Sequence, residues 1–561
     1  MSIRNQERCD AVVIGAGFAG MYALHRLRDD LDMNVVAIER GEDVGGTWYW
    51  NRYPGARCDA ESIFYSYSFD PALQADWNWS EKYATQPEIL AYASHVADRF
   101  DLRRSIRFNT DVTAAHFDEN DDMWLVQTSS GNIRTRFLIT ALGCLSASRI
   151  PEIDGLGDFA GQVYHTGRWP HEGVDLTGKR VAMVGTGSSG IQLLPAIAAD
   201  CAQVTVFQRT PNYSVPARNR KLGPDELTRI RSVYGALWAE ARLSPAGQVI
   251  AAPTGSALAA GAGARDELDR RWAEGGPGFL AAFTDTMLDE RANAVTADYV
   301  RDRILETVDD PRTADLLCPK DYPIGAKRIC VDTDYYATFN RDNVELVDVA
   351  TTPIERITAG GIVVGGIEYP TDVIAFATGF DAITGPFDAI DIRGRDGAGL
   401  RSAWAEGPRS YLGLAVHGFP NMFTITGPGS PSVLSNMMAS IEQHVDWIAG
   451  YLTFLSALGV TTSEAARTAQ DAWVQEVDEI AAATLYVKGK SWYLGANVPG
   501  KPRVFMPYAG GVGVYRRQCD LVAAKGYPGF THSVASHAHH AGDAARTGTT
   551  PNDAAAVPAG A

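Results

Sequence analysis

Cysteine is scarce in this sequence and is never paired at short spacing. The chain has seven cysteines in 561 residues, and no two of them stand in a C-x-x-C arrangement. Most zinc sites, dithiol redox centres and compact disulfide frameworks need such clustering. We therefore predict no metal site and no disulfide-reductase chemistry, and we expect each cysteine to be a small buried side chain.

The sequence also lacks an excess of positive charge and lacks long apolar runs. Its formal net charge is −17, which disfavours nucleic acid or an anionic membrane as a partner, because both bind concentrated lysine and arginine. There is no uncharged apolar stretch of about 18 residues, so no transmembrane helix is predicted. The N-terminus is polar and leads into a predicted strand, which is not typical of a secretory signal. We expect a cytoplasmic protein without a membrane partner.

A strand–glycine–helix unit near the N-terminus is the first recognisable motif. An apolar strand over 11–14 is followed by GAGFAG at 15–20 and by a helical stretch, and a second strand over 35–38 ends in Glu39. The glycines let the backbone approach a pyrophosphate, and the helix N-terminus supplies oriented N–H groups. A carboxylate at the end of the second strand can accept hydrogen bonds from ribose hydroxyls. This unit therefore predicts a site for the adenosine half of FAD.

A second copy of the unit lies further along the chain. A strand over 181–184 is followed by GTGSSG at 185–190 and a helix, and the next strand, over 204–207, leads to Arg209. The charged residue stands 19 positions after the third glycine in both copies (39 − 20 and 209 − 190). Arginine can pair with a ribose 2′-phosphate, whereas a carboxylate would repel it. The second unit therefore favours NADPH over NADH.

The repeated unit predicts the fold class and the division of the chain. We expect an α/β protein with two dinucleotide-binding (Rossmann-like) domains, one for each unit. The region from about Pro224 to Ala314 is rich in helix formers and charges, so it is expected to be a helical insertion. The segment 441–457 has the pattern of an amphipathic helix. The predicted parts are 1–150 and 345–531 for the FAD-binding domain, 151–222 and 316–344 for the NADP-binding domain, 223–315 for the helical insertion, and 532–561 for a disordered tail.

Further motifs carry a resemblance to a known family. The run 159–170 matches FxGxxxHxxxWP, and 45–59 matches GGxWxxxxYPGxxxD. The pair Lys327-Arg328 and the run SWYLGAN at 491–497 also match. With these motifs the chain resembles the Baeyer–Villiger monooxygenases, over nearly its whole length from about Cys9 to Phe530.

The resemblance implies an oxidation of ketones by O2. FAD would take hydride from NADPH and react with O2 to a peroxyflavin, and one oxygen atom would enter beside the carbonyl to give an ester or lactone. It implies Arg328 as the catalytic cation and Asp59 as its carboxylate partner. A guanidinium suits this role because it stays protonated and offers several donors to developing negative charge. The loop 427–434 makes the chain look closest to the phenylacetone and steroid monooxygenases.

The motifs also imply which residues contact the two cofactors. Lys327 is expected to join Arg209 around the 2′-phosphate, and Trp492 to contact NADP. His165 is expected to make interdomain hydrogen bonds rather than to act as a general base. The full set expected at FAD or NADPH is Gly15, Gly17, Phe18, Ala19, Gly20, Glu39, Gly46, Thr47, Trp48, Tyr49, Trp50, Arg57, Cys58, Asp59, Ala60, Tyr65, Val112, Gly185, Thr186, Gly187, Ser188, Ser189, Gly190, Ile191, Gln192, Arg209, Thr210, Lys327, Arg328, Met437 and Trp492.

Three other interpretations stay open at this point. The nearest is a flavin monooxygenase that oxidises sulfur or nitrogen, against which Trp169 and Arg328 argue. A non-catalytic FAD- and NADPH-binding redox sensor is disfavoured by the intact Asp59, Arg328 and 159–170 motif, and an uncoupled NADPH oxidase is the third. The ketone itself (aryl-alkyl, cyclic or steroid-like) and the oligomeric state are not indicated by the sequence.

Overall fold

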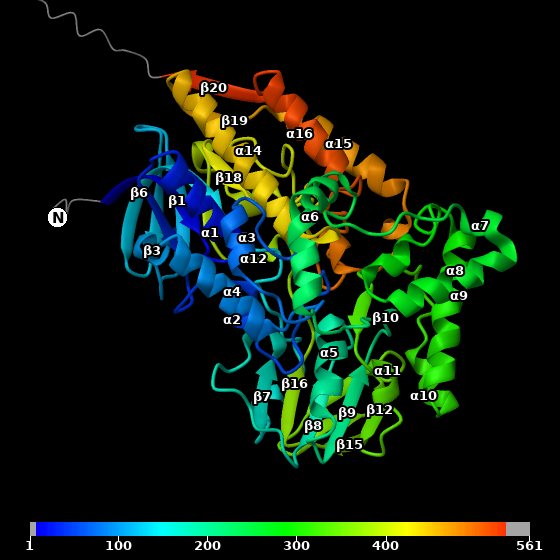
Figure 1. Cartoon of the computed structure of the whole chain (residues 1–561). Coiled ribbons are helices and arrows are strands. Elements are labelled where there is room, and N and C mark those ends of the chain that lie inside the picture. Colours follow the sequence, from blue (N-terminus) through cyan, green and yellow to red (C-terminus); the bar gives the residue numbers. More distant parts are fainter. Residues whose placement is uncertain (1–6, 535–561) are drawn as a thin grey trace, which may run out of the picture.

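The computed structural model describes residues 7–534. Its α/β core consists of two separate sheets, each built on one of the predicted strand–glycine–helix units (Figure 1). The predicted fold class, with two Rossmann-like domains and a helical insertion, is confirmed. The seven cysteines are all buried and unpaired. Within the described part of the chain, no helix is both long and apolar enough to span a bilayer.

The first sheet holds the N-terminal unit. Its order is β17-β4-β5-β6-β1-β2-β3, with β18 also paired to β6. Strands β1, β2, β6 and β18 run parallel, whereas β4, β5 and β6 form an antiparallel meander. The bounds are β1 Glu7–Ile14, β2 Val35–Ile38, β3 Ile106–Arg107, β4 Val112–Asp118, β5 Met123–Thr128, β6 Gly131–Thr140, β17 Asp391–Arg393 and β18 Met422–Thr424.

The second sheet is entirely parallel and has the order β12-β9-β8-β16-β7. Its central strands are buried on both faces, which explains their continuous apolar runs. The bounds are β7 Gln162–His165, β8 Arg180–Val184, β9 Gln203–Gln208, β12 Val344–Asp348 and β16 Val373–Phe376. A three-stranded meander joins β12 to β16, and a separate pair is formed by β10 and β11; these are β13 Ile354–Ile357, β14 Gly361–Val364, β15 Ile367–Pro370, β10 Ser214–Pro216 and β11 Cys330–Asp332.

This topology corrects one predicted boundary. The division at 344/345 cuts through β12, and β16 belongs to the second sheet although it was assigned to the FAD-binding part. The contribution of the chain to the second sheet therefore extends to Phe376. The physical reason is that short, fully buried strands look alike in either sheet, and only their pairing partners distinguish them.

Helices α9 and α10 of the helical insertion lie beside the second sheet, whereas α6 lies above it, towards the first fold (Figure 1). Asp289 and Asp310 cap two of its helices by accepting hydrogen bonds from backbone N–H groups of the first turn, and proline occupies the first turn of two helices. Helix α6 also packs against α16 near the C-terminus. The bounds are α6 Pro224–Leu243, α7 Ala257–Ala260, α8 Ala264–Glu274, α9 Glu290–Thr307 and α10 Pro311–Leu317.

The C-terminal helices return to the first sheet, where α14 packs against α1 and α16. The helix predicted over 441–457 exists but begins at Met437, where Asn436 caps it. It is amphipathic as predicted, because Asp446, Gly450, Thr453 and Ser456 form an exposed stripe at helical spacing, although Glu442 and His444 are buried with its apolar residues. The helices of this region are α1 Phe18–His25, α14 Met437–Ala457, α15 Arg467–Ala482 and α16 Val512–Ala524.

An antiparallel pair of strands and the remaining helices complete the fold. Strands β19 (Val460–Ala465) and β20 (Phe530–Val534) pair antiparallel. The strand continues past the predicted start of the tail at 532, which corrects that boundary; residues 535–561 lie outside the described residues. The remaining α-helices are α2 Thr47–Trp50, α3 Pro71–Asp76, α4 Gln86–Arg99, α5 Ser188–Ile197, α11 Tyr335–Thr338, α12 Gly385–Asp388 and α13 Leu400–Ala403.

Candidate active site

The first glycine loop brings a helix N-terminus close to the end of β1. A Cβ on Gly20 would overlap the carbonyl oxygen of Gly15, so only glycine permits this packing of α1. A Cβ on Gly17 would lie 3.3 Å from the Cα of Gly46, which places the two predicted glycine segments face to face. This is a narrow, backbone-lined cradle of the kind that a pyrophosphate fits.

Glu39 stands at the end of β2 as predicted and is buried. Its carboxylate accepts hydrogen bonds from the backbone N–H of Ala16 (2.8 Å) and of Gly41 (2.8 Å). It is therefore fixed beside the glycine loop. Carboxylate oxygens have further acceptor capacity, so the residue fits an adenosine ribose.

The second glycine loop repeats this geometry at the start of α5. A Cβ on Gly190 would collide with the Gly185 carbonyl, whereas no heavy atom lies within 4 Å of the position of a Cβ on Gly187. The Thr186 hydroxyl donates to the carbonyl of Thr210 (2.8 Å) and ties the loop to the end of β9. Arg209, next to that carbonyl, is exposed. The backbone fits a second dinucleotide.

Positive charge gathers beside this second loop. Burial, followed by the charge of Arg209, lowers the pKa of Lys327 to about 8, and Lys490 acts in the same direction. The Nζ of Lys327 also lies 4.3 Å from the ring centroid of Tyr322. A cluster whose own charges repel one another is stabilised by a dianionic ligand, so these residues fit a 2′-phosphate.

The two predicted catalytic residues form a bidentate ion pair. Arg328 donates from Nε to Asp59 Oδ2 (2.7 Å) and from Nη2 to Asp59 Oδ1 (2.8 Å), and its Nη1 donates to the carbonyl of Val433 (2.6 Å). About a third of the arginine side chain, 32 %, is accessible, so the guanidinium still faces open space. The pair joins the loop after α2, the segment before β11 and the loop 427–434.

Each member of the pair holds the other in its charged form. Burial lowers the pKa of Arg328, but the charge and hydrogen bonds of Asp59 outweigh burial and raise it above its ordinary value. Burial raises the pKa of Asp59, and the charge of Arg328 reverses this shift, so the carboxyl pKa lies below its usual value. The site therefore contains a permanently protonated guanidinium.

Tyr493 is a neighbour of Arg328 that the predicted site residues omit. Burial raises the pKa of the phenol above its ordinary value, although the charge of Arg328 acts in the opposite direction. The ring centroid lies 4.4 Å from that of Trp492, a predicted NADP contact. The SWYLGAN motif was the available signal, because the tyrosine follows the tryptophan directly.

Three predicted FAD-contacting aromatics lie together. Trp48 Nε1 donates to the Tyr65 hydroxyl (3.0 Å), and the two rings meet edge to face at 5.7 Å. Phe18, at the start of α1, lies 5.9 Å from Tyr65. Cys58 is buried in the same apolar cluster, and burial raises the pKa of its thiol well above the ordinary value.

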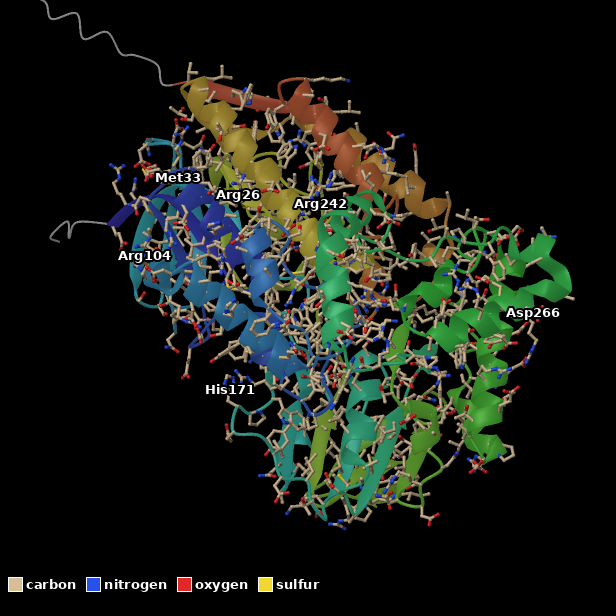
Figure 2. The ribbon with its side chains drawn as sticks, in the orientation of Figure 1. Arg26, Met33, Arg104, His171, Arg242 and Asp266 are labelled. Atoms are coloured by element: carbon tan, nitrogen blue, oxygen red, sulfur yellow. The ribbon has the colours of Figure 1, made fainter. Side chains whose placement is uncertain are left out.

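Other predicted residues lie at the margin of this arrangement. Tyr49 and Trp50 contact the ring of His171, which Figure 2 places in the loop below α2, towards the second sheet. Val112 begins β4 inside the core of the first sheet, and Met437 is half-buried at the start of α14. The Arg57 side chain pairs with Glu81. Their roles at a cofactor stay predictions.

His165 ends β7, where the chain connects the two sheets. Its Nδ1 accepts from the N–H of Gly167 (2.9 Å), and its ring meets Phe380 edge to face at 6.0 Å. Burial lowers the pKa of His165. The imidazole is thus kept neutral in a buried connection, while its predicted interdomain role stays a prediction.

Several known proteins are similar to this chain in sequence and in fold. A family model described as pyridine nucleotide-disulphide oxidoreductase matches residues 12–243. A Baeyer-Villiger monooxygenase of Pseudooceanicola batsensis is 43 % identical over 524 residues, which cover 92 % of this chain and 95 % of that protein. A phenazine N-monooxygenase of Lysobacter antibioticus is 40 % identical over 526 residues, 93 % of this chain and 96 % of that protein.

Solved structures agree with these relatives. An oxidized steroid monooxygenase bound to NADP superposes with a TM-score of 0.90 at 51 % identity, covering 94 % of this chain and 99 % of the other. A structure titled as OTEMO in complex with FAD and NADP has a TM-score of 0.90 at 40 % identity, with coverage of 94 % and 99 %.

Two dinucleotide folds with an arginine–carboxylate pair between them define an NADPH-dependent flavoprotein oxidoreductase. The two sites fit both cofactors, because each has a backbone cradle, with Glu39 beside the first and the cations beside the second. The chain belongs to the Baeyer–Villiger monooxygenases, and its cofactors are FAD and NADPH.

Proposed function

We propose that this enzyme inserts one oxygen atom of O2 beside the carbonyl of an apolar ketone, with Arg328 as the catalytic residue and Asp59 as the group that holds it. The observation that carries this proposal is the bidentate Arg328–Asp59 pair, anchored by Val433 between the two dinucleotide folds. FAD, once reduced by NADPH, supplies the activation of O2. The protein residues orient the reactants and stabilise charge.

Arg328 fits the demand for an electrostatic catalyst. Attack on a ketone carbon moves negative charge onto the carbonyl oxygen, and a preorganised cationic donor stabilises that charge. A guanidinium has five N–H donors, and three of them bind Asp59 and Val433. The remaining edge of the fork can therefore face a reacting oxygen without breaking the pair.

The substrate side of Arg328 is apolar. Val433 and Tyr493, which both adjoin the arginine, belong to one buried cluster that also packs against half-buried side chains from other segments. Large apolar walls favour ketones with a hydrophobic body. The proposed wall consists of Leu145, Val433, Leu434, Met437, Tyr493 and Phe505. The 51 % identity to a steroid monooxygenase supports a steroid-like ketone.

A second candidate reaction is oxidation of an aromatic nitrogen. The 40 % identity to a phenazine N-monooxygenase over nearly the whole chain favours this alternative. Nitrogen oxidation transfers oxygen to a lone pair and develops no carbonyl oxyanion. It therefore has less need of Arg328 than ester formation has, and the two reactions can be separated by one variant.

The proposal is tested by NADPH consumption under air with identified products. Phenylacetone, cyclohexanone and a 20-ketosteroid are offered beside phenazine and an alkyl aryl sulfide. Stimulated consumption with ester or lactone formed from a ketone supports the proposal. Peroxide alone with every ketone, or an N-oxide as the only organic product, overturns it.

A further inference from the structure

A loop from the FAD side of the molecule is seated on helix α5 of the second dinucleotide fold. Tyr53 and Ala56 are buried in the apolar core of that second fold. Gly55 between them has φ +83, and a Cβ there would collide with the Gln192 carbonyl and lie 3.0 Å from the Cβ of Ala196. The loop 53–57 thus touches the backbone of α5 directly.

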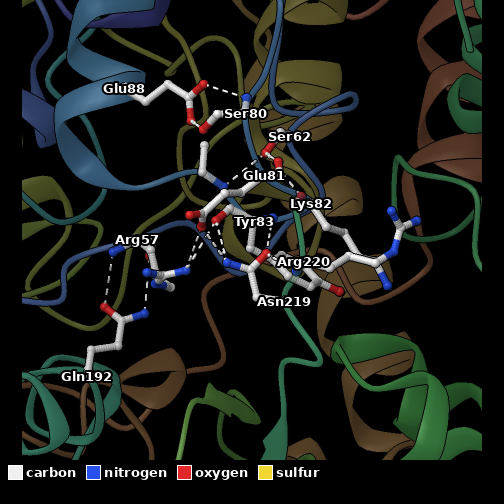
Figure 3. Close-up of polar contacts among 11 residues, drawn as sticks. Arg57, Ser62, Ser80, Glu81, Lys82, Tyr83, Glu88, Gln192, Asn219 and Arg220 are labelled. Carbon is white, nitrogen blue, oxygen red and sulfur yellow. Dashed lines mark hydrogen bonds and ion pairs between the residues drawn. The ribbon is translucent and has the colours of Figure 1, made fainter. Parts of the chain in front are cut away.

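The side chain of Gln192 fastens this loop. Its Oε1 accepts from the Tyr53 hydroxyl (2.8 Å) and from the backbone N–H of Arg57 (3.4 Å), and its Nε2 donates to the carbonyl of Arg57 (3.1 Å). Figure 3 shows the amide bracketing the main chain of Arg57. One side chain therefore fixes both backbone polar groups of a residue two positions before Asp59.

The far side of Arg57 is held as well. Its guanidinium pairs with Glu81 (3.3 Å), which also accepts from the amide of Asn219 (2.6 Å), and Asn219 Oδ1 accepts from the N–H of Tyr83 (2.9 Å). The backbone N–H of Cys58 donates to the carbonyl of Ala84 (3.2 Å). The stretch from Arg57 to Asp59 is thus clamped between α5 and the segment 81–84 (Figure 3).

We propose that Gln192 is a positioning residue that couples the NADP-binding helix to the Arg328–Asp59 pair. The glycine loop at 185–190 leads into α5, and Gln192 lies on that helix about one turn after its first residue, Ser188. A helix is rigid over that length, so ordering of its N-terminus by a nucleotide restrains the amide and, through it, the loop that carries Asp59. The proposal gives Gln192 an interdomain role beside its predicted cofactor contact, and it rests on the proposed roles of Asp59 and Arg328.

Hydrogen exchange of the FAD-loaded protein tests the coupling without any turnover. In the wild type, added NADP+ is expected to slow exchange both at the start of α5 and over 53–59. In Gln192→Ala, NADP+ is expected still to slow exchange at the start of α5 but no longer to slow it over residues 53–59. Equal protection of 53–59 in both proteins overturns the proposal. Gln475→Ala is the matched control, because Gln475 is exposed on α15 and bonds only locally to Glu479.

A second measurement asks whether the coupling reaches the reaction. Gln192→Ala is expected to form roughly tenfold less ester per NADPH consumed, because small displacements of a catalytic group are costly. The milder variant Tyr53→Phe removes one of the three hydrogen bonds of Gln192, so its ester yield per NADPH is expected to lie between those of the wild type and Gln192→Ala. A weakened Kd for NADP+ with unchanged ester yield overturns the proposal and makes Gln192 a cofactor contact. Failure of the wild type to form any ester refutes the proposed function instead, and the exchange result is independent of it.

Discussion

Replacing Arg328 with alanine should separate flavin reduction from oxygen insertion. The substitution removes a charge that the protein holds close to Asp59 and Val433, while both glycine cradles are left intact. At an effective dielectric constant of about 20, a unit charge about 4 Å from a developing oxyanion is worth ~4 kcal/mol, and ~4 kcal/mol corresponds to roughly three powers of ten in rate. Loss of an oxyanion donor costs a similar 10²–10³-fold in well-studied enzymes, as an order-of-magnitude guide.

Stopped-flow absorbance and product analysis measure the two half-reactions apart. We expect anaerobic reduction of the FAD by NADPH to stay within about tenfold of the wild type in Arg328→Ala, and ester formation to fall by ~10³-fold. Arg328→Lys is the matched control: it keeps the charge but loses the two-pronged geometry, and it should retain an intermediate activity. Ester formation within tenfold of the wild type in the alanine variant would refute the electrostatic role. Loss of flavin reduction would show instead that the pair positions the nicotinamide.

The other predictions concern the cofactor sites and one helix cap. Arg209→Ala should weaken binding of NADPH by roughly 10–100-fold, through loss of charged hydrogen bonds, and leave NADH unaffected, as titration with both nucleotides would reveal. Since the pKa of Lys327 is lowered to about 8, the side chain is cationic below that pH and neutral above it; NADP+ affinity measured by calorimetry should therefore fall as the pH rises through about 8, and the decline should vanish in Lys327→Ala. Gly20→Ala should yield protein without bound flavin, visible as loss of yellow absorbance, because the added methyl overlaps the Gly15 carbonyl; retention of full FAD would contradict the cradle. Asn436→Ala should lower the free energy of unfolding by ~2–3 kcal/mol in denaturant titration, because its amide both caps α14 and donates to two buried carbonyls.

The parts of the site that are local in sequence were predictable. Each glycine loop is specified by about thirty consecutive residues, in which a strand, a turn and a helix must alternate. Glu39 and Arg209 follow from that spacing. The partnership of Asp59 and Arg328 came only from the family resemblance, because 269 positions separate the two residues and no local pattern joins them.

The errors in the predicted domain boundaries share a cause: no local sequence pattern specifies which strands pair with one another. Strand β16 reads as a buried strand, but nothing in it says which sheet it joins. Burial of single polar residues is likewise set by the fold, because Glu442 and His444 of helix α14 are ionisable and yet lie inside. Burial raises the pKa of Glu442 to about 7 and lowers that of His444 to about 3, so both residues can lie inside with less charge than the sequence suggests.

The anchoring of Arg328 by Val433 has a consequence for how the enzyme is assembled. The arginine and the carbonyl that receives its third hydrogen bond are 105 positions apart, and the partner carboxylate lies far upstream in the chain. A nascent chain that has formed only its first glycine fold already has a cradle for a dinucleotide, but it lacks the cation. Oxygen insertion therefore depends on the last third of the polypeptide being in place, because the segment that supplies Val433 also leads into α14, which packs against α1 of the first fold.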